Sequence, residues 1–146
     1  MLRTILVVDD SEVVQYIYAG FLSRYYGTRL VTATDGAEAL KCVSREPETD
    51  LILLDLNLPV VNGLEVLERL GGNPKHRGIP VVVVTSRSRE MDIERCLAAG
   101  ARGYLMKPFD AQELHDVIES VTGEKPSDAP RASPAPRAPA IQKPCR

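Results

Sequence analysis

The sequence predicts an α/β domain in which a parallel sheet is covered by helices on both faces. Apolar runs rich in β-branched residues alternate, about five times, with segments whose apolar residues recur at helical spacing. The connections are short, and right-handed crossovers then place the strands parallel in one sheet. The clearest strand is Leu51 to Asp55, an apolar run buried on both faces that ends abruptly in a carboxylate.

The first strand and the first helix are predicted on either side of residue 9, where a continuous apolar run gives way to apolar residues at helical spacing. Ile5 to Val8 is rich in β-branched residues and ends in two adjacent carboxylates, Asp9 and Asp10. Either Asp10 or Ser11 can cap the helix that follows, which Gly27 ends. The apolar face of this helix consists of Val14, Ile17, Tyr18, Phe21, Leu22 and Tyr25.

The second and third units follow the same pattern. Leu30 to Ala33 is a weaker strand, and a turn at Asp35-Gly36 leads into a short helix that Pro47 closes. The apolar residues of that helix are Ala37, Leu40 and Val43. After the strand that ends at Asp55, turn residues mark a loop, and a helix with Leu64, Leu67 and Leu70 at helical spacing comes next.

The fourth and fifth strands lie in the second half of the chain. Gly71 to Gly78 forms a loop, Val81 to Val84 is a strand that ends at Thr85, and Gly103 to Met106 is a strand that ends at Lys107. Ser88 to Ala99 is a helix with a poor apolar stripe, so we expect it to be loosely held. The last helix starts with Asp110 and Glu113 as a capping box and presents Leu114, Val117, Ile118 and Val121 on one face. His115 is expected off that face.

Polar residues stand at four of the predicted strand exits. They are Asp9 with Asp10, Asp55, Thr85 and Lys107. All strands of a parallel sheet end at the same edge, so these residues are predicted to be neighbours. Open α/β sheets bind ligands at this edge, and we therefore expect the functional site there.

Composition divides the chain into two parts. Residues 1–123 carry 13 Lys and Arg against 18 Asp and Glu, whereas residues 124–146 carry 5 against 2. Of the 11 prolines, 6 lie between residues 126 and 146, where they alternate with Ala and Ser. A segment of this kind buries too little apolar surface to offset its ordering entropy. We therefore predict a domain over 1–123 and a disordered, basic, Pro/Ala-rich tail over 124–146.

Several broad classes of protein are disfavoured. No apolar run approaches the ~20 residues of a membrane span, and the amino terminus lacks a secretory pattern. The 3 cysteines lack metal-binding spacing, which favours reduced thiols and a cytoplasmic protein. The residues after 123 leave no room for an output domain, so no DNA partner is expected.

Four motifs together resemble the receiver domain of two-component response regulators. They are Asp9-Asp10, Asp55 followed by Leu-Pro-x-x-Asn-Gly, Thr85-Ser86 and Lys107-Pro108-Phe109. The resemblance runs from residue 3 to about 123 and implies a flavodoxin-like sheet of order 2-1-3-4-5 with five helices. It implies a signalling switch rather than an enzyme, of the chemotaxis type and without an attached output domain. Its phosphoryl group would come from a histidine kinase or phosphotransfer protein.

The resemblance also assigns a metal site. Asp55 would be the phosphoacceptor, and Asp9 and Asp10 would bind Mg²⁺ or Mn²⁺ together with Asp55 and the backbone carbonyl of Asn57. Three carboxylates in one crevice repel each other, and a hard divalent cation removes that repulsion. The metal is therefore expected to be required for phosphorylation.

Three further residues receive roles from the resemblance. Lys107 would bind the phosphoryl oxygens, Thr85 would be the switch hydroxyl, and Tyr104 the switch aromatic. Phosphorylation would change a partner-binding face made of the fourth helix, the fifth strand and the last helix. Motility, phosphorelay and developmental pathways all remain open for the output.

Two other functions compete with this one. A metal-dependent phosphatase with an aspartyl nucleophile usually carries its nucleophile and general acid two residues apart, whereas Asp9 and Asp10 are adjacent. A pseudo-receiver would keep the fold as a phosphorylation-independent binding module. All the reactive positions are filled here, which favours the phosphorylated switch.

Overall fold

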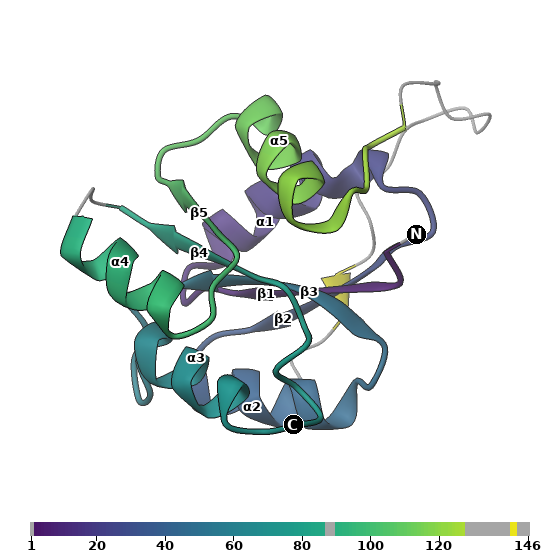
Figure 1. The fold of residues 1–146 in the computed structure, drawn as a ribbon. Helices are drawn as coiled ribbons and strands as arrows, with labels where there is room; N and C mark the ends of the chain where they lie inside the picture. Colours follow the sequence, from purple (N-terminus) through teal and green to yellow (C-terminus); the bar gives the residue numbers. More distant parts are fainter. Residues whose placement is uncertain (1, 87–89, 128–140, 143–146) are drawn as a thin grey trace.

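The chain forms one parallel sheet between two layers of helices in a computed structural model, which describes residues 2–86, 90–127 and 141–142 (Figure 1). Every strand pair in the sheet is parallel. The strands are β1 (Thr4–Val8), β2 (Arg29–Ala33), β3 (Thr49–Asp55), β4 (Val81–Thr85), β5 (Gly103–Met106) and β6 (Ile141–Gln142).

The order of the five predicted strands is 2-1-3-4-5, which confirms the predicted topology. The two-residue strand β6, which the sequence analysis did not predict, pairs with β2 at Leu30 and Val31. It therefore lies at the outer edge of the sheet. Residues 128–140 and 143–146 of the predicted disordered tail lie outside the described residues.

The helices are α1 (Glu12–Phe21), α2 (Gly36–Arg45), α3 (Gly63–Gly71), α4 (Glu90–Ala98) and α5 (Ala111–Thr122), and a short 3-10 turn, η1 (Leu22–Arg24), extends α1. Helices α1 and α5 cover one face of the sheet, and α2, α3 and α4 lie against the other (Figure 1). The predicted start of α4 at Ser88 falls outside the described residues.

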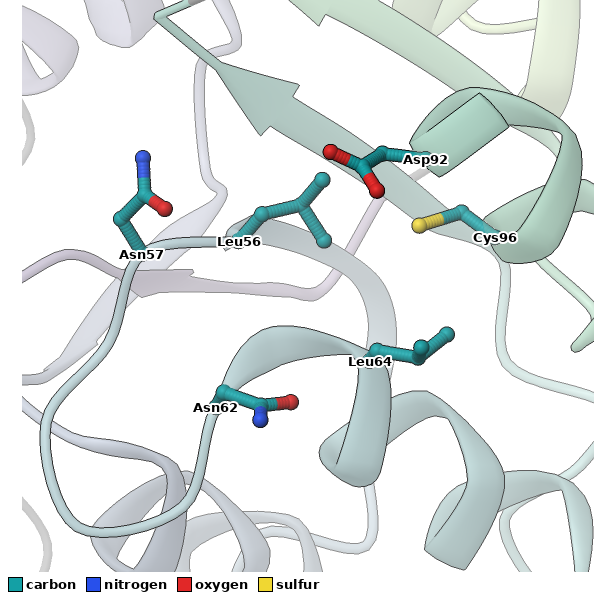
Figure 2. Close-up of a pocket in the computed structure, with 6 residues that line it drawn as sticks. All are labelled: Leu56, Asn57, Asn62, Leu64, Asp92 and Cys96. Atoms are coloured by element: carbon teal, nitrogen blue, oxygen red, sulfur yellow. The ribbon is translucent and has the colours of Figure 1, made fainter. Parts of the chain in front are cut away.

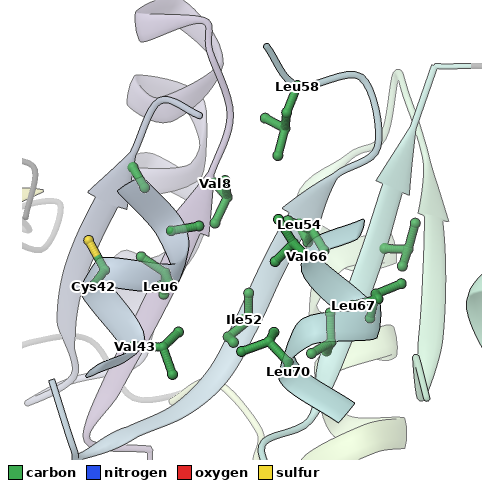
Figure 3. Packing of buried hydrophobic residues seen from close by; sticks show 14 of the residues in the cluster. Leu6, Val8, Cys42, Val43, Ile52, Leu54, Leu58, Val66, Leu67 and Leu70 are labelled. Carbon is green, nitrogen blue, oxygen red and sulfur yellow. The ribbon is translucent and has the colours of Figure 1, made fainter. Parts of the chain in front are cut away.

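Alternating side chains of the central strands supply two separate cores. Leu6 and Val8 of β1 pack with α2 and α3 (Figure 3), whereas Ile5 and Val7 of the same strand pack with α1 and α5. All five residues of β1 and of β4 are buried. Because both faces are covered, the strand ends are fixed in position by packing on two sides.

Side-chain caps fix where α1, α2, α3 and α5 begin. Ser11, Asp35, Asn62 and Asp110 each accept a hydrogen bond from the backbone N–H three residues later, at 3.3, 2.7, 3.0 and 2.8 Å. These bonds satisfy amides that have no partner inside the helix. Of the two candidate caps for α1, the structure uses Ser11, so the Asp10 carboxylate is left for the strand edge.

The loop between β3 and α3 is held tightly against the end of β3. A Cβ added at Gly63 would lie 2.6 Å from the carbonyl oxygen of Asp55, so only glycine fits there. Val60 has φ 68°, a left-handed conformation that costs a β-branched residue roughly 1–2 kcal/mol. Its side chain is 82% exposed, so burial does not compensate for this strain.

The expected position of His115 was wrong. The residue is only 5% exposed, and its Nε2 lies 2.7 Å from the Phe21 carbonyl oxygen. Its ring also makes an edge contact with Tyr25. Helix α5 packs against α1 as well as against the sheet. The side of α5 that carries His115 is therefore buried too. The spacing of apolar residues indicated only the first side.

Candidate functional site

Three carboxylates meet at the carboxyl edge of the sheet. Asp9 and Asp10 follow β1, and Asp55 ends the neighbouring strand β3, where Val8 pairs with Leu54. One carboxylate oxygen from each residue lies within 4.8 Å of the other two. The predicted convergence of these residues, which are far apart in the sequence, is confirmed.

Lys107 joins this cluster from the loop after β5. Its Nζ lies 2.7 Å from Asp9 Oδ2 and 3.1 Å from Asp55 Oδ2, so one ammonium group bridges both carboxylates. The backbone N–H of Lys107 donates to the carbonyl of Thr85 at 2.7 Å. The lysine is therefore fixed to the end of β4 as well as to the acids.

The remaining oxygens of the two buried acids are also hydrogen-bonded. Asp9 is 1% exposed and Asp55 is 5% exposed. Oδ1 of Asp9 accepts from the Ser11 amide at 2.9 Å, and Oδ1 of Asp55 accepts from the Asn57 amide at 3.0 Å. Asp10 is exposed at the mouth of the cluster, so solvent and small ions reach the acids from its side.

The electrostatics of the cluster favour an additional cation. Burial raises the pKa of the Asp55 carboxyl above its usual value, and the Asn57 hydrogen bond and the Lys107 charge offset this only in part, while Asp9 adds to it. For Lys107, burial lowers the pKa, but the hydrogen bond to Asp9 and the charge of Asp55 outweigh it and raise the pKa overall. Lys107 is thus held as a cation, and within the part of the chain that the structure describes its single positive charge faces the three carboxylates.

The donor set fits a hard divalent cation. Carboxylate oxygens are the ligands that Mg²⁺ and Mn²⁺ prefer, and both ions retain water readily at an open position. Asp9, Asp10 and Asp55 supply carboxylate oxygens within reach of one ion, on the side of the cluster open to solvent. The chemistry of these residues is that of a Mg²⁺ site.

The other residues that the sequence analysis selected lie around this cluster at different depths. Thr85 is buried at the end of β4, one residue beyond Val84, which pairs with Asp55. Tyr104 is 47% exposed on the edge strand β5. Asn57 is exposed and follows Asp55 by two residues. The structure thus brings Lys107 onto the acids, places Thr85 at the same edge, and sets Tyr104 on the outer strand.

Two hollows lined by residues that the structure describes adjoin the cluster, and the sequence predicted neither. A cavity of about 240 Å³ separates the start of the β3–α3 segment from α4, and Figure 2 shows its lining: Leu56, Asn57, Asn62, Leu64, Asp92 and Cys96. An apolar groove of about 370 Å³ lies beside Lys107 and is lined by Val14, Ile17, Ser86, Lys107, Pro108 and Phe109. Each combines residues from distant segments, which spacing in the sequence does not reveal.

Gln15 is a buried polar residue for which the sequence pattern indicates no role. It is 7% exposed on α1, and its side-chain amide donates to the carbonyl oxygen of Asp9 at 2.8 Å. The position of Gln15 next to apolar Val14 was the only indication in the sequence that it could be buried. A glutamine at such a position is more often at the surface.

Comparison with known proteins gives one consistent result. The model of the response regulator receiver domain matches residues 5–119. A chemotaxis protein CheY homolog from Campylobacter jejuni is 30% identical over 119 residues, which cover 82% of this chain and 92% of that protein. The polar-differentiation response regulator DivK from Brucella ovis is 32% identical over 124 residues, 85% of this chain and 99% of that protein.

Solved structures extend the comparison to the metal. The receiver domain of a sensor histidine kinase from Pseudomonas aeruginosa is 31% identical, with a TM-score of 0.74, and covers 85% of this chain and all (100%) of that one. That structure contains a magnesium ion coordinated in its active-site cleft. The chain described here has the same fold and an acidic triad suited to the same ion. It therefore belongs to the response regulator receiver domain family, whose members are phosphorylation-dependent signalling switches that accept a phosphoryl group from histidine kinases.

Proposed function

We propose that Asp55 is the residue that accepts the phosphoryl group. One observation carries this assignment: the Asp55 carboxylate ends the central strand β3 with Lys107 on one oxygen and two further carboxylates beside it. Asp9 and Asp10 are the other members of the acidic group and directly follow β1. Their proposed role is to hold the metal rather than to react. Asn57 is proposed to add its backbone carbonyl to the metal site.

The reaction at Asp55 is a transfer between two nucleophiles. A carboxylate oxygen of Asp55 forms a bond to phosphorus while the bond from phosphorus to the donor nitrogen of a phosphohistidine breaks. The product is an acyl phosphate that carries a charge of about −2 on its phosphoryl oxygens. Hydrolysis by water later returns the carboxylate and inorganic phosphate, which resets the switch.

Lys107 is proposed to balance the charge that moves during transfer. Its ammonium already bridges Asp9 and Asp55 and can turn to an equatorial phosphoryl oxygen as that oxygen arrives. When bound at the acids, Mg²⁺ neutralises them and polarises the phosphoryl oxygens. The contribution of the chain is to hold the carboxylate oxygens and the Lys107 ammonium in position before the phosphoryl donor docks.

The output is proposed to run through Thr85 and α4. The Thr85 hydroxyl would turn to a phosphoryl oxygen, Tyr104 would rotate inward, and α4 would shift. The cavity of about 240 Å³ beside α4 supports this, because it gives the helix room to move (Figure 2). The partner-binding face is then built from α4, β5 and α5, where Tyr104 and Met106 are exposed.

The wider setting is also a proposal. We infer a cytoplasmic switch in which residues 1–123 are the receiver and residues 124–146 a basic tail, with a histidine kinase or phosphotransfer protein as donor. Among the helices that the structure describes, none has the length and apolar character needed to cross a membrane. The CheY and DivK likenesses support an output through protein contacts.

The first test of the proposed function is removal of the metal. We expect incubation with acetyl phosphate and Mg²⁺ to add the mass of one phosphoryl group, and we expect no gain in excess EDTA, because the acids then repel the incoming phosphoryl group. Intact-mass spectrometry measures both. Equal phosphorylation with and without metal would contradict the proposed chemistry, and no gain with either acetyl phosphate or a panel of histidine kinases would favour a phosphorylation-independent binding module.

The second test separates the switch from the chemistry. We expect Tyr104→Ala to keep native phosphorylation, because the residue lies on the outer strand away from the acids, and to lose most of the phosphorylation-dependent gain in partner binding. Partner capture from matched phosphorylated and unphosphorylated samples measures that gain. Met106→Ala, on the same strand and 40% exposed, controls for the loss of exposed apolar area. Full output in Tyr104→Ala would refute the proposed role.

A further inference from the structure

Gln15 connects three elements beneath the acidic cluster. Its side-chain Nε2 donates to the carbonyl oxygen of Asp9 at 2.8 Å and lies 3.5 Å from the carbonyl oxygen of Ala33. The backbone amide of Asp9 donates to the same Ala33 carbonyl at 3.0 Å. A single amide group on α1 therefore contacts the carbonyl groups at the ends of both β1 and β2, which pair with each other at this point.

The carbonyl that Gln15 binds belongs to the peptide between Asp9 and Asp10. Fixing this peptide plane restricts ψ of Asp9 and φ of Asp10, the two torsions that, together with the neighbouring peptides, set the directions of the two Cα–Cβ bonds. The backbone N–H of Gln15 meanwhile donates to the Ser11 carbonyl at 3.0 Å, which is the first bond of α1. The helix start and the acidic pair are thus held by the same residue.

The chemistry at this position goes beyond packing. Gln15 is 7% exposed, and burying an amide costs free energy unless its donors are paired. An apolar residue of the same volume would fill the space without that cost. The amide is therefore useful here for its hydrogen bond to Asp9, next to the residues that hold the metal.

We propose that Gln15 is a positioning residue for the metal site, which rests on the proposed function. It orients the Asp9-Asp10 peptide so that both carboxylates face the same ion before the ion binds. Without Gln15, both carboxylates are still present, but they are not held in the binding orientation in advance. The metal must then order them when it binds, which weakens its affinity. Preorganisation of this kind appears as metal affinity rather than as reaction rate.

The test is a titration of three variants of the full chain with Mg²⁺ by calorimetry. Gln15→Met matches the volume and removes the donor, and we expect it to weaken Mg²⁺ binding about five- to tenfold, the equivalent of one net hydrogen bond. Gln15→His can place a ring N–H near the same position, so we expect it to restore most of the affinity.

Thr28→Val provides a matched control at the opposite end of the sheet. The Thr28 hydroxyl donates to the Leu2 carbonyl at 2.9 Å, so this variant also loses one bond from a side chain to the backbone. We expect its loss of thermal stability to resemble that of Gln15→Met, while its Mg²⁺ affinity stays native. A purely structural role for Gln15 would give both variants the same affinity.

Phosphorylation by acetyl phosphate adds a second readout. For Gln15→Met we expect the Mg²⁺ concentration at half-maximal rate to rise by the same factor, with the rate at saturating Mg²⁺ within twofold of native. Native affinity in Gln15→Met, or weakened affinity in Thr28→Val, would overturn the inference while leaving the proposed function intact. Failure of the native chain to bind Mg²⁺ would overturn both.

Discussion

Replacing Asp55 by Asn is expected to abolish uptake of a phosphoryl group from acetyl phosphate in the presence of Mg²⁺. The side-chain amide has nearly the same shape as the carboxylate, but it is neutral and a poor nucleophile. Its nitrogen or oxygen can still occupy the space beside Lys107 and Asp9, so the fold is retained. Intact-mass spectrometry of the native chain and the variant, treated in parallel, measures the difference.

A matched control lies on the same strand. Asp50, near the start of β3, accepts hydrogen bonds from the backbone amides of Arg3 and Thr4 at 2.8 and 3.1 Å. Asp50→Asn changes an acid of the same strand at the opposite edge of the sheet, so it should keep native phosphorylation. Retained uptake in Asp55→Asn would place the acceptor elsewhere, and peptide mapping would identify it.

Much of this site could be predicted because a parallel sheet brings the ends of its strands to the same edge. Each buried strand is visible as a short apolar run, and the polar residue that ends each run must lie at the same edge as the others. Asp9, Asp55 and Lys107 are therefore placed together by topology alone. The family resemblance then distinguishes their roles, which the topology leaves equal.

The features that escaped prediction depend on contacts between elements. Gln15 is buried because its side chain meets the carbonyls of Asp9 and Ala33 at the ends of two strands. His115 is buried because α5 packs against α1 as well as against the sheet. The left-handed conformation of Val60 also runs against the usual preference of a β-branched residue. No pattern of apolar spacing or of residue type in the sequence marks these positions as buried or strained. They are recognised only once the elements are packed together.

Replacing Lys107 by Met is expected to slow phosphorylation by acetyl phosphate about 10²- to 10³-fold at saturating Mg²⁺. This is the usual cost of losing one preorganised group that stabilises charge in a transition state. Met fills a similar volume, and Asp55, the proposed acceptor, is unchanged. Single-turnover rates followed by intact mass measure the effect.

The same substitution should raise the affinity of the site for Mg²⁺, although it slows phosphorylation. In the native chain the Lys107 ammonium lies 2.7 Å from Asp9 Oδ2 and 3.1 Å from Asp55 Oδ2, where its positive charge repels an arriving cation. We therefore expect Lys107→Met to bind Mg²⁺ more tightly than the native chain while it reacts more slowly. Lys125→Met removes an exposed lysine paired with Glu119 at 3.5 Å and should change neither quantity. Weaker Mg²⁺ binding together with slower transfer would mean that Lys107 only supports the fold of the site, whereas tighter binding with slower transfer assigns it to the transferring phosphoryl group.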